Sequence, residues 1–162
     1  MKRLLPILFA LVTLLSLAAC SDQAKYSTNA NFYYCVNEFD YALDASVIKC
    51  EERTVNYPSN EYKSIIQEYL HGPRTHNLKS PFPQDLSVTE LVVEDDTTYI
   101  TFSTDLSYLT GTNLSLACIC IAKTCFDLTQ TQNVDISAEH ATLDNAPSVF
   151  ISRNSILLND DY

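Results

Sequence analysis

Six cysteines and three histidines are the residues of this chain whose chemistry could build a functional site. Three of the cysteines, Cys118, Cys120 and Cys125, lie close enough in sequence to suggest a metal cluster. On an α-helix, however, Cys118 and Cys125 would be about 10 Å apart at a rise of 1.5 Å per residue, and Cys120 would point to a different face. Three thiols placed in this way do not converge on one tetrahedral zinc ion. We therefore expect them to be small buried hydrophobic residues.

Cys35 and Cys50 are a second pair to consider, because both fall on predicted strands outside the membrane. Disulfides form and persist in oxidising extracytoplasmic compartments. If the two strands pair in register, a disulfide between Cys35 and Cys50 could form, whereas a reducing habitat would leave both residues as thiols. The sequence leaves these two alternatives open.

The histidines and the acidic clusters give no recognisable catalytic or metal-binding pattern. His71, His76 and His140 contain no pair at ligand spacing, and neither a Gly-x-Ser-x-Gly nor a His-Glu-x-x-His motif occurs. The runs Glu94-Asp95-Asp96 and Asp160-Asp161 lack the alternating oxygen ligands and the glycine of a calcium-binding loop. We expect no catalytic residue, no metal site and no cofactor.

The N-terminal segment has the pattern of a secretory signal peptide. Lys2 and Arg3 precede an uncharged apolar run, residues 4–17, which is shorter than the roughly 20 residues that span a bilayer. The run ends in Leu-Ala-Ala followed by Cys20, which resembles a bacterial lipobox. That resemblance implies lipidation of the Cys20 thiol and cleavage before it; an ordinary secreted protein with an incidental cysteine is the alternative. Acyl chains, palmitate among them, would then hold the mature chain at the outer face of the cell membrane.

Four segments follow from these patterns. We assign residues 1–19 to the lipoprotein signal peptide, 20–30 to the lipidated cysteine and a tether, 31–140 to one folded domain, and 141–162 to a C-terminal extension that packs on the domain or trails it. Loss of Lys2 and Arg3 with the signal peptide changes the net charge from −10 to −12. Such an acidic chain is a poor ligand for nucleic acid, because binding there depends on Lys and Arg that neutralise phosphates.

Hydrophobic periodicity places two helices and several strands within the domain. Apolar residues recur at helical spacing over 60–71 and 114–128, and β-branched and aromatic residues favour strands over 31–36, 46–55, 86–94, 98–103 and 133–138. The second helix is apolar almost all round, which indicates burial on two sides. The order of elements predicts an α+β fold, with a single sheet of mixed or antiparallel strands and two helices packed on one face. We expect Glu51, Glu52 and Arg53 to form an exposed ion-pair edge.

The motifs that these elements carry resemble the sporulation and spore germination domain family, called GerMN. The resemblance rests on five stretches in order, namely Tyr33-Tyr34, Arg53-Thr54-Val55, Leu70-His71-Gly72-Pro73, Pro83 with Leu86–Val88, and Ile100-Thr101-Phe102-Ser103. The apolar helix 114–128 and the strand at 134–136 close the domain, so roughly residues 31–140 are covered. The chain departs from the family pattern at Asp95-Asp96, where the hairpin turn usually carries Asp-Gly. The resemblance implies a ring-building-motif-like fold and a binding module.

Together these observations predict a non-catalytic lipoprotein that is attached to the membrane through Cys20 and lies outside the cytoplasm. Its expected role is as a binding module in envelope, spore or cell-wall assembly, with an envelope protein or peptidoglycan as the partner. A peptidoglycan-associated regulator of a cell-wall hydrolase is the alternative. The exposed face of helix 114–128 and the apolar tail at 148–158 are the predicted contact surfaces.

Overall fold

The computed structural model describes residues 26–37, 46–57 and 62–157. The signal peptide, Cys20 and Asp160-Asp161 lie outside the described residues. The elements, in chain order, are β1 (Tyr26–Val36), β2 (Ile48–Tyr57), α2 (Tyr62–Leu70), β3 (Leu78–Lys79), β4 (Val88–Glu94), β5 (Thr97–Phe102), the 3-10 helix η1 (Thr104–Tyr108), α3 (Gly111–Thr129), β6 (Asn133–Ala138), β7 (Ser148–Ser152) and α4 (Arg153–Leu157).

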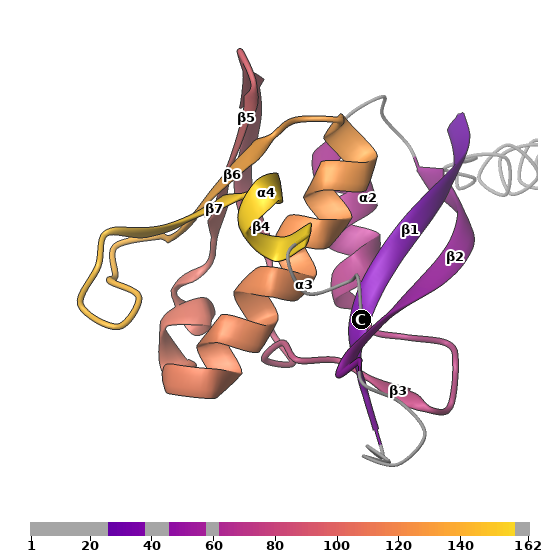
Figure 1. Ribbon diagram of the computed structural model, residues 1–162, viewed down its shortest axis with the longest axis horizontal. Coiled ribbons are helices and arrows are strands. Elements are labelled where there is room, and N and C mark those ends of the chain that lie inside the picture. The colour runs from indigo at the N-terminus through magenta and orange to yellow at the C-terminus, as the bar shows by residue number, and fades with distance from the viewer. Residues whose placement is uncertain (1–25, 38–45, 58–61, 158–162) are drawn as a thin grey trace, which may run out of the picture.

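The described strands form two sheets, one with the order β2-β1-β3 and the other with the order β4-β5-β6-β7. Figure 1 shows the two sheets on either side of the molecule, with α2 and α3 between them. The predicted α+β class is confirmed, but the helices lie between two sheets instead of covering one face of a single sheet. The reason is that β1 pairs with β2 on one side and with β3 on the other, and none of the three joins the sheet built around β5 and β6.

The four-stranded sheet combines a hairpin, a crossover and the C-terminal segment. β4 and β5 pair as an antiparallel hairpin across the two-residue turn Asp95-Asp96, in which Asp95 takes the left-handed region with φ +51°. β5 and β6 are parallel, and α3 makes the crossover between them that a parallel pair requires. β7 then pairs antiparallel with β6. Residues 148–152 of the C-terminal extension are thus part of this sheet, and the last residues assigned to the tether, 26–30, are part of β1.

α2 forms where the sequence places apolar residues on one helical face. Ile65, Ile66, Tyr69 and Leu70 are the buried residues of this helix, which contacts β4 and β2. Gly72 follows with φ +92°, a left-handed conformation that glycine adopts without steric cost and that ends the helix.

α3 is buried on two sides, as its apolar sequence predicts. It contacts β1 on one side and β6 and β7 on the other. The exposed face predicted for 114–128 is therefore small. Arg153 closes the C-terminal end of α3, because its guanidinium donates to the carbonyl oxygens of Phe126 and Thr131 and lies 5.0 Å from the centre of the Phe126 ring. Among the described helices, none combines the length and the apolarity needed to cross a membrane.

Candidate functional site

Glu51 and Arg53 form a buried ion pair that fixes the loop after α2. Both side chains are buried, and Arg53 Nε donates to Glu51 Oε1 at 3.0 Å. The exposed ion-pair edge predicted for these residues is wrong. Along β2, alternate residues face the core, and Glu51 and Arg53 share the buried face with Val55 and Tyr57.

The ion pair binds the backbone of the loop that follows α2. Arg53 Nη2 donates to the Gly72 carbonyl oxygen and to Tyr34 Oη, each at 3.1 Å. Glu51 Oε2 accepts the backbone N–H groups of Arg74, at 3.0 Å, and of Thr75, at 2.8 Å. Two of the motifs behind the family resemblance, the Arg-Thr-Val strand and the Leu-His-Gly-Pro stop, are therefore in direct contact.

The charge on Glu51 makes the stability of the fold depend on pH. Burial alone would raise the pKa of Glu51, but the hydrogen bonds from Thr75 and the Arg53 guanidinium outweigh it, so the pKa lies below its ordinary value of 4.5. A depressed carboxyl pKa contributes stability that is present above pH 4.5 and is lost as the pH falls through the folded-state pKa.

We predict that the free energy of unfolding falls as the pH is lowered below 4.5, and that Glu51→Gln removes part of this fall. Chemical denaturation of both proteins from pH 7 to pH 3 measures it. Equal acid sensitivity in the two proteins would contradict this role for Glu51.

The five cysteines in the described part of the chain are all free thiols, and four of them are buried. Strands β1 and β2 do pair, but Cys50 lies opposite Tyr33 and Cys35 lies opposite Ile48. This two-residue offset means that Cys35 and Cys50 are not cross-strand neighbours, and the bridge considered from the sequence is not formed in this structure. The nearer thiol to Cys35 is Cys120, whose hydrogen bond lowers the pKa of Cys35 to about 7.

Cys118, Cys120 and Cys125 are buried in the core, as expected for small apolar residues. Burial raises the pKa of Cys118 and of Cys125 to about 12, so both stay protonated at neutral pH. Among the described residues, no group of three or more His, Cys, Asp or Glu side chains is arranged to hold a metal ion.

We predict that Cys50 is the only one of the five described cysteines to react rapidly with a thiol reagent in the folded protein, because the other four are buried. Labelling with a chromogenic disulfide reagent, before and after unfolding, measures this in a Cys20→Ala background. Cys50→Ser should abolish the rapid phase. A rapid phase that persists in this variant would show that a buried thiol is accessible.

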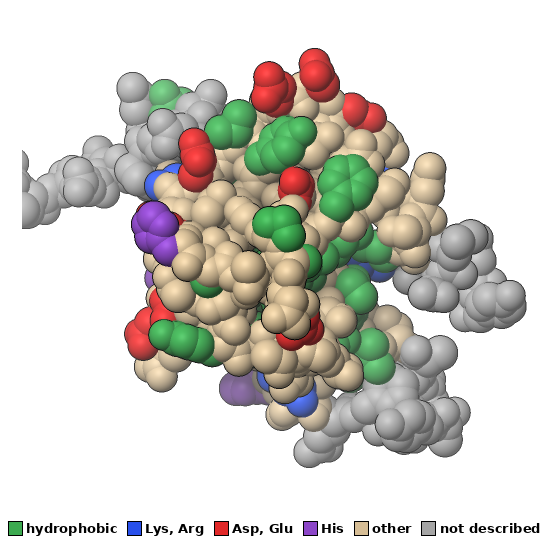
Figure 2. Space-filling model, turned by 90° about the vertical axis from the view of Figure 1, so that its left-hand side faces the viewer, with side chains coloured by type: hydrophobic (Ala, Val, Ile, Leu, Met, Phe, Trp, Pro, Cys, Tyr) green, Lys and Arg blue, Asp and Glu red, His purple; other side chains and the backbone are tan. Residues whose placement is uncertain are grey.

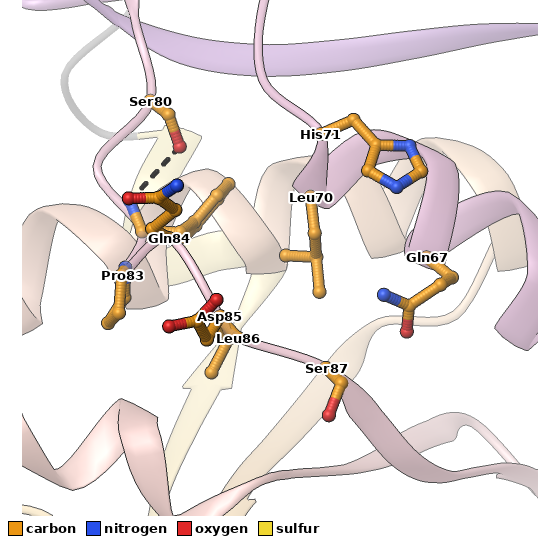
Figure 3. Close-up of a pocket in the computed structure, with 10 residues that line it drawn as sticks. Gln67, Leu70, His71, Ser80, Pro83, Gln84, Asp85, Leu86 and Ser87 are labelled. Atoms are coloured by element: carbon orange, nitrogen blue, oxygen red, sulfur yellow. Dashed lines mark hydrogen bonds between the residues drawn. The ribbon is translucent and has the colours of Figure 1, made fainter.

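A cleft of about 540 Å³ lies between the end of α2 and the loop that enters β4 (Figure 3). Its lining residues are Gln67, Leu70, His71, Ser80, Phe82, Pro83, Gln84, Asp85, Leu86 and Ser87. His71 is exposed, and its Nδ1 lies 3.1 Å from the carboxylate of Glu68. The cleft offers hydrogen-bonding groups on a wide, open surface.

His76 and His140 lie away from this cleft lining, and both are exposed. His140 follows β6 with its Nε2 3.8 Å from Glu139. In the acidic run 94–96, Asp96 has a structural contact, because its carboxylate accepts the backbone N–H of Gln132 at 3.0 Å. This bond ties the hairpin turn to the start of β6.

The outer face of the four-stranded sheet carries a row of three apolar residues and one aspartate that the sequence did not reveal. Strand pairing aligns Val92 with Tyr99, Tyr99 with Asp135, and Asp135 with Phe150, one residue from each strand. Tyr99 is 45% exposed and Phe150 is 61% exposed. We call these four residues the outer row. Figure 2 views this side of the molecule and shows hydrophobic side chains gathered there, with acidic side chains around and between them.

Acidic side chains frame the outer row. Glu90 and Glu94 flank Val92 on β4 and, with Tyr99 and Thr101, line a shallow hollow of about 240 Å³. Asp135 lies between the two aromatic residues of the row, and its buried oxygen Oδ1 has no hydrogen-bond partner among the described residues. A buried acceptor of this kind usually has a donor.

This two-sheet α+β fold, with α2 and α3 between the sheets, is shared with domains of the GerMN type. Two solved structures share the fold, both of GerM, a sporulation protein from Bacillus subtilis. Its tandem GerMN domains match with a TM-score of 0.59 and 14% identity over 83% of this chain and 49% of that one. Its first GerMN domain matches with a TM-score of 0.57 and 12% identity over 78% of this chain and 98% of that one.

The chain belongs to the Germane family, described as sporulation and spore germination, whose model matches residues 32–144. This confirms the family resemblance drawn from the motifs. The chain spans about half the length of the tandem GerM structure, which contains two such domains. A candidate lipoprotein from Clostridium perfringens also matches, with a TM-score of 0.47 and 16% identity over 87% of this chain and 97% of that one. None of the curated proteins matches the sequence.

Proposed function

We propose that this protein is a lipid-anchored, non-catalytic binding module at the outer face of a bacterial membrane, where it contacts an envelope protein during spore, envelope or cell-wall assembly. The outer row is the observation that carries the proposal. It places exposed apolar side chains from three strands, Val92 on β4, Tyr99 on β5 and Phe150 on β7, on the outer sheet face, whereas a domain without a partner would favour polar residues there.

Three further features support this proposal. The family to which the chain belongs is described by sporulation and spore germination. The lipobox-like sequence ending at Cys20 would hold the domain at the membrane. Only five residues separate Cys20 from Tyr26, the first residue of β1, so a lipidated domain would stay close to the membrane surface.

Crosslinking in intact cells tests the proposal. The full-length chain is expected to yield a reproducible adduct with one envelope protein, and Tyr99→Ser with Phe150→Ser should reduce that adduct strongly. The matched control is Tyr108→Ser, because Tyr108 is 74% exposed but lies in η1, away from the outer row. Only non-specific adducts, or an adduct unaffected by the double variant, would contradict the proposal.

Cys20→Ala tests the anchor separately. We expect the wild-type protein to carry acyl chains, which supply membrane affinity at about 0.8 kcal/mol per buried CH₂ group. The variant should lack them and keep residues 1–19 uncleaved, which gel mobility or intact mass measures. Metabolic labelling with an alkyne-bearing fatty acid provides the second readout. An unlabelled wild-type protein would contradict lipidation at Cys20, yet leave binding at the outer row testable by the crosslinking above.

A further inference from the structure

β4 is an edge strand of the four-stranded sheet. Side chains of α2 form hydrogen bonds with the backbone only at the start of this strand. The side chain of Gln67 accepts the backbone N–H of Val88 at 3.0 Å, and Lys63 Nζ donates to the carbonyl oxygen of Thr89 at 2.7 Å. Beyond these two residues, β4 pairs with β5 on one side, and within the described part of the chain no strand pairs with its other side. An unpaired edge of this kind is a template for another strand.

The geometry of the hairpin fixes which backbone groups face outward. The two-residue turn is closed by the pair Glu94 and Thr97, and such a closing pair exchanges its hydrogen bonds within the hairpin. By alternation, Val92 also bonds to β5, whereas Leu91 and Val93 direct their N–H and carbonyl groups to the free edge. These two residues provide a short ladder for an added strand.

Hollows on the two sides of β4 differ in chemistry. The first, of about 450 Å³, lies along the edge of β4 beside α2 and is lined by Tyr62, Lys63 and residues 89–93. Val93 and Tyr62 are both exposed, large hydrophobic residues. The second is the outer-face hollow with the carboxylates of Glu90 and Glu94 beside the Tyr99 ring. Because side chains of a strand alternate between faces, one added strand would present side chains to both hollows.

We propose that the edge of β4 from Glu90 to Glu94 accepts, as a fifth strand, an extended protein segment in which basic and apolar residues alternate. The basic side chains lie on the outer face, paired with Glu90 and Glu94 and stacked near the Tyr99 ring, which suits Lys or Arg. The apolar side chains lie beside Val93. In this mode of recognition, main-chain hydrogen bonds provide the affinity and alternate side chains provide the specificity. The inference rests on the proposed function and specifies the chemistry of the protein partner.

A second copy of this chain does not fit the same edge. Antiparallel pairing of β4 with itself about Val92 would set Glu90 of one copy opposite Glu94 of the other. Like charges directly opposite each other across two strands are destabilising. Charge complementarity therefore selects a basic segment from a different protein.

Amide hydrogen exchange of the full-length chain in detergent tests this inference. The probes are octapeptides that alternate lysine or arginine with valine or leucine, and the matched set carries glutamate in place of the basic residues. The basic peptides should slow exchange of the Leu91 and Val93 amides by about tenfold. This corresponds to a stabilisation of the edge by roughly 1.4 kcal/mol at the peptide concentration used. The glutamate set should leave both amides unchanged.

Charge and edge variants make the test specific. Glu90→Gln with Glu94→Gln should weaken binding of the basic peptides about three- to tenfold, as loss of two exposed charge pairs implies, and reduce its salt dependence. Glu52→Gln, an exposed position on β2, is the matched control and should have no effect. Val93→Pro removes an edge N–H and should abolish peptide protection of the Leu91 amide while the circular dichroism spectrum is retained.

Three results would overturn the inference. They are unchanged Leu91 and Val93 exchange with every basic peptide, equal protection by the glutamate set, and protection that depends on protein concentration alone, which would indicate a second copy at the edge. Failure here is distinct from failure of the proposed function. If crosslinking captures an envelope protein that requires Tyr99 and Phe150 while the β4 amides stay unprotected, the binding module stands and strand addition is wrong.

Discussion

Arg53→Ala is expected to lower the free energy of unfolding by about 3–5 kcal/mol, because removal of one partner leaves a buried charge without compensation. The Arg53 side chain is 4% exposed. Its guanidinium bonds to Glu51 and to the Gly72 carbonyl oxygen, and lies 4.7 Å from the centre of the Phe32 ring. The substitution therefore removes the counter-charge of Glu51, a bond to the loop after α2, and a cation–π contact. Urea denaturation at pH 7 measures the change.

Arg74→Ala is the matched control for this prediction. The Arg74 side chain is 67% exposed and pairs with Glu68 at the surface, where an ion pair is worth between 0 and about 1 kcal/mol. Its backbone N–H, which donates to Glu51, is retained in alanine. Equal losses from Arg53→Ala and Arg74→Ala would show that the buried pair does not hold the loop.

Tyr69→Ala is expected to lower the free energy of unfolding by about 3–5 kcal/mol through the cavity it creates. Tyr69 is fully buried, and its ring lies 5.1 Å from the Phe32 ring and 5.0 Å from the Phe82 ring. It also links α2 to β1 twice, since its hydroxyl donates to the Tyr33 carbonyl oxygen and its own carbonyl accepts from Tyr34 Oη.

Two further variants separate the contributions of Tyr69. Tyr69→Phe keeps the ring and removes one hydrogen bond, so we expect a loss of about 1–3 kcal/mol from the carbonyl left unsatisfied. Tyr62→Ala, at the exposed start of the same helix, should cost far less. If Tyr62→Ala were as damaging as Tyr69→Ala, the ring cluster would not be the element that joins α2 to β1.

Local patterns in the sequence predicted the elements well, and for physical reasons. The apolar spacing of 114–128 predicted both α3 and its burial on two sides, because the same residues contact β1 and β6. The strand at 133–138 matches β6, and the hairpin closes across Asp95-Asp96 although glycine is absent there. Aspartate can take the left-handed conformation through local hydrogen bonding by its short side chain.

The buried ion pair was missed although the sequence contained a signal for it. Glu51, Glu52 and Arg53 looked like a solvated charge cluster. Period-two alternation, however, puts Glu51 and Arg53 on the face of Val55, and leaves Glu52 on the other. This alternation predicts that both charged side chains point into the core. Buried charges are stable only when they form an ion pair and hydrogen bonds, so Glu51 and Arg53 must contact each other.

The outer row could not be predicted from the sequence. Its members, Val92, Tyr99, Asp135 and Phe150, come from four strands, and only the register between those strands aligns them. A shift of one residue in any strand would turn its member to the opposite face. The division into two sheets has the same origin, since it depends on long-range pairing and not on local propensity.

Site-specific photo-crosslinking in intact cells tests the central claim, that the outer face of the four-stranded sheet is the partner surface of a membrane-anchored module. A photoreactive phenylalanine analogue replaces Tyr99 or Phe150 on the outer row, and Tyr108 in η1 as the exposed aromatic control. We predict one common envelope-protein adduct from both outer-row positions and none from Tyr108. Adducts from Tyr108 alone, or no specific adduct from Tyr99 and Phe150, would contradict the account.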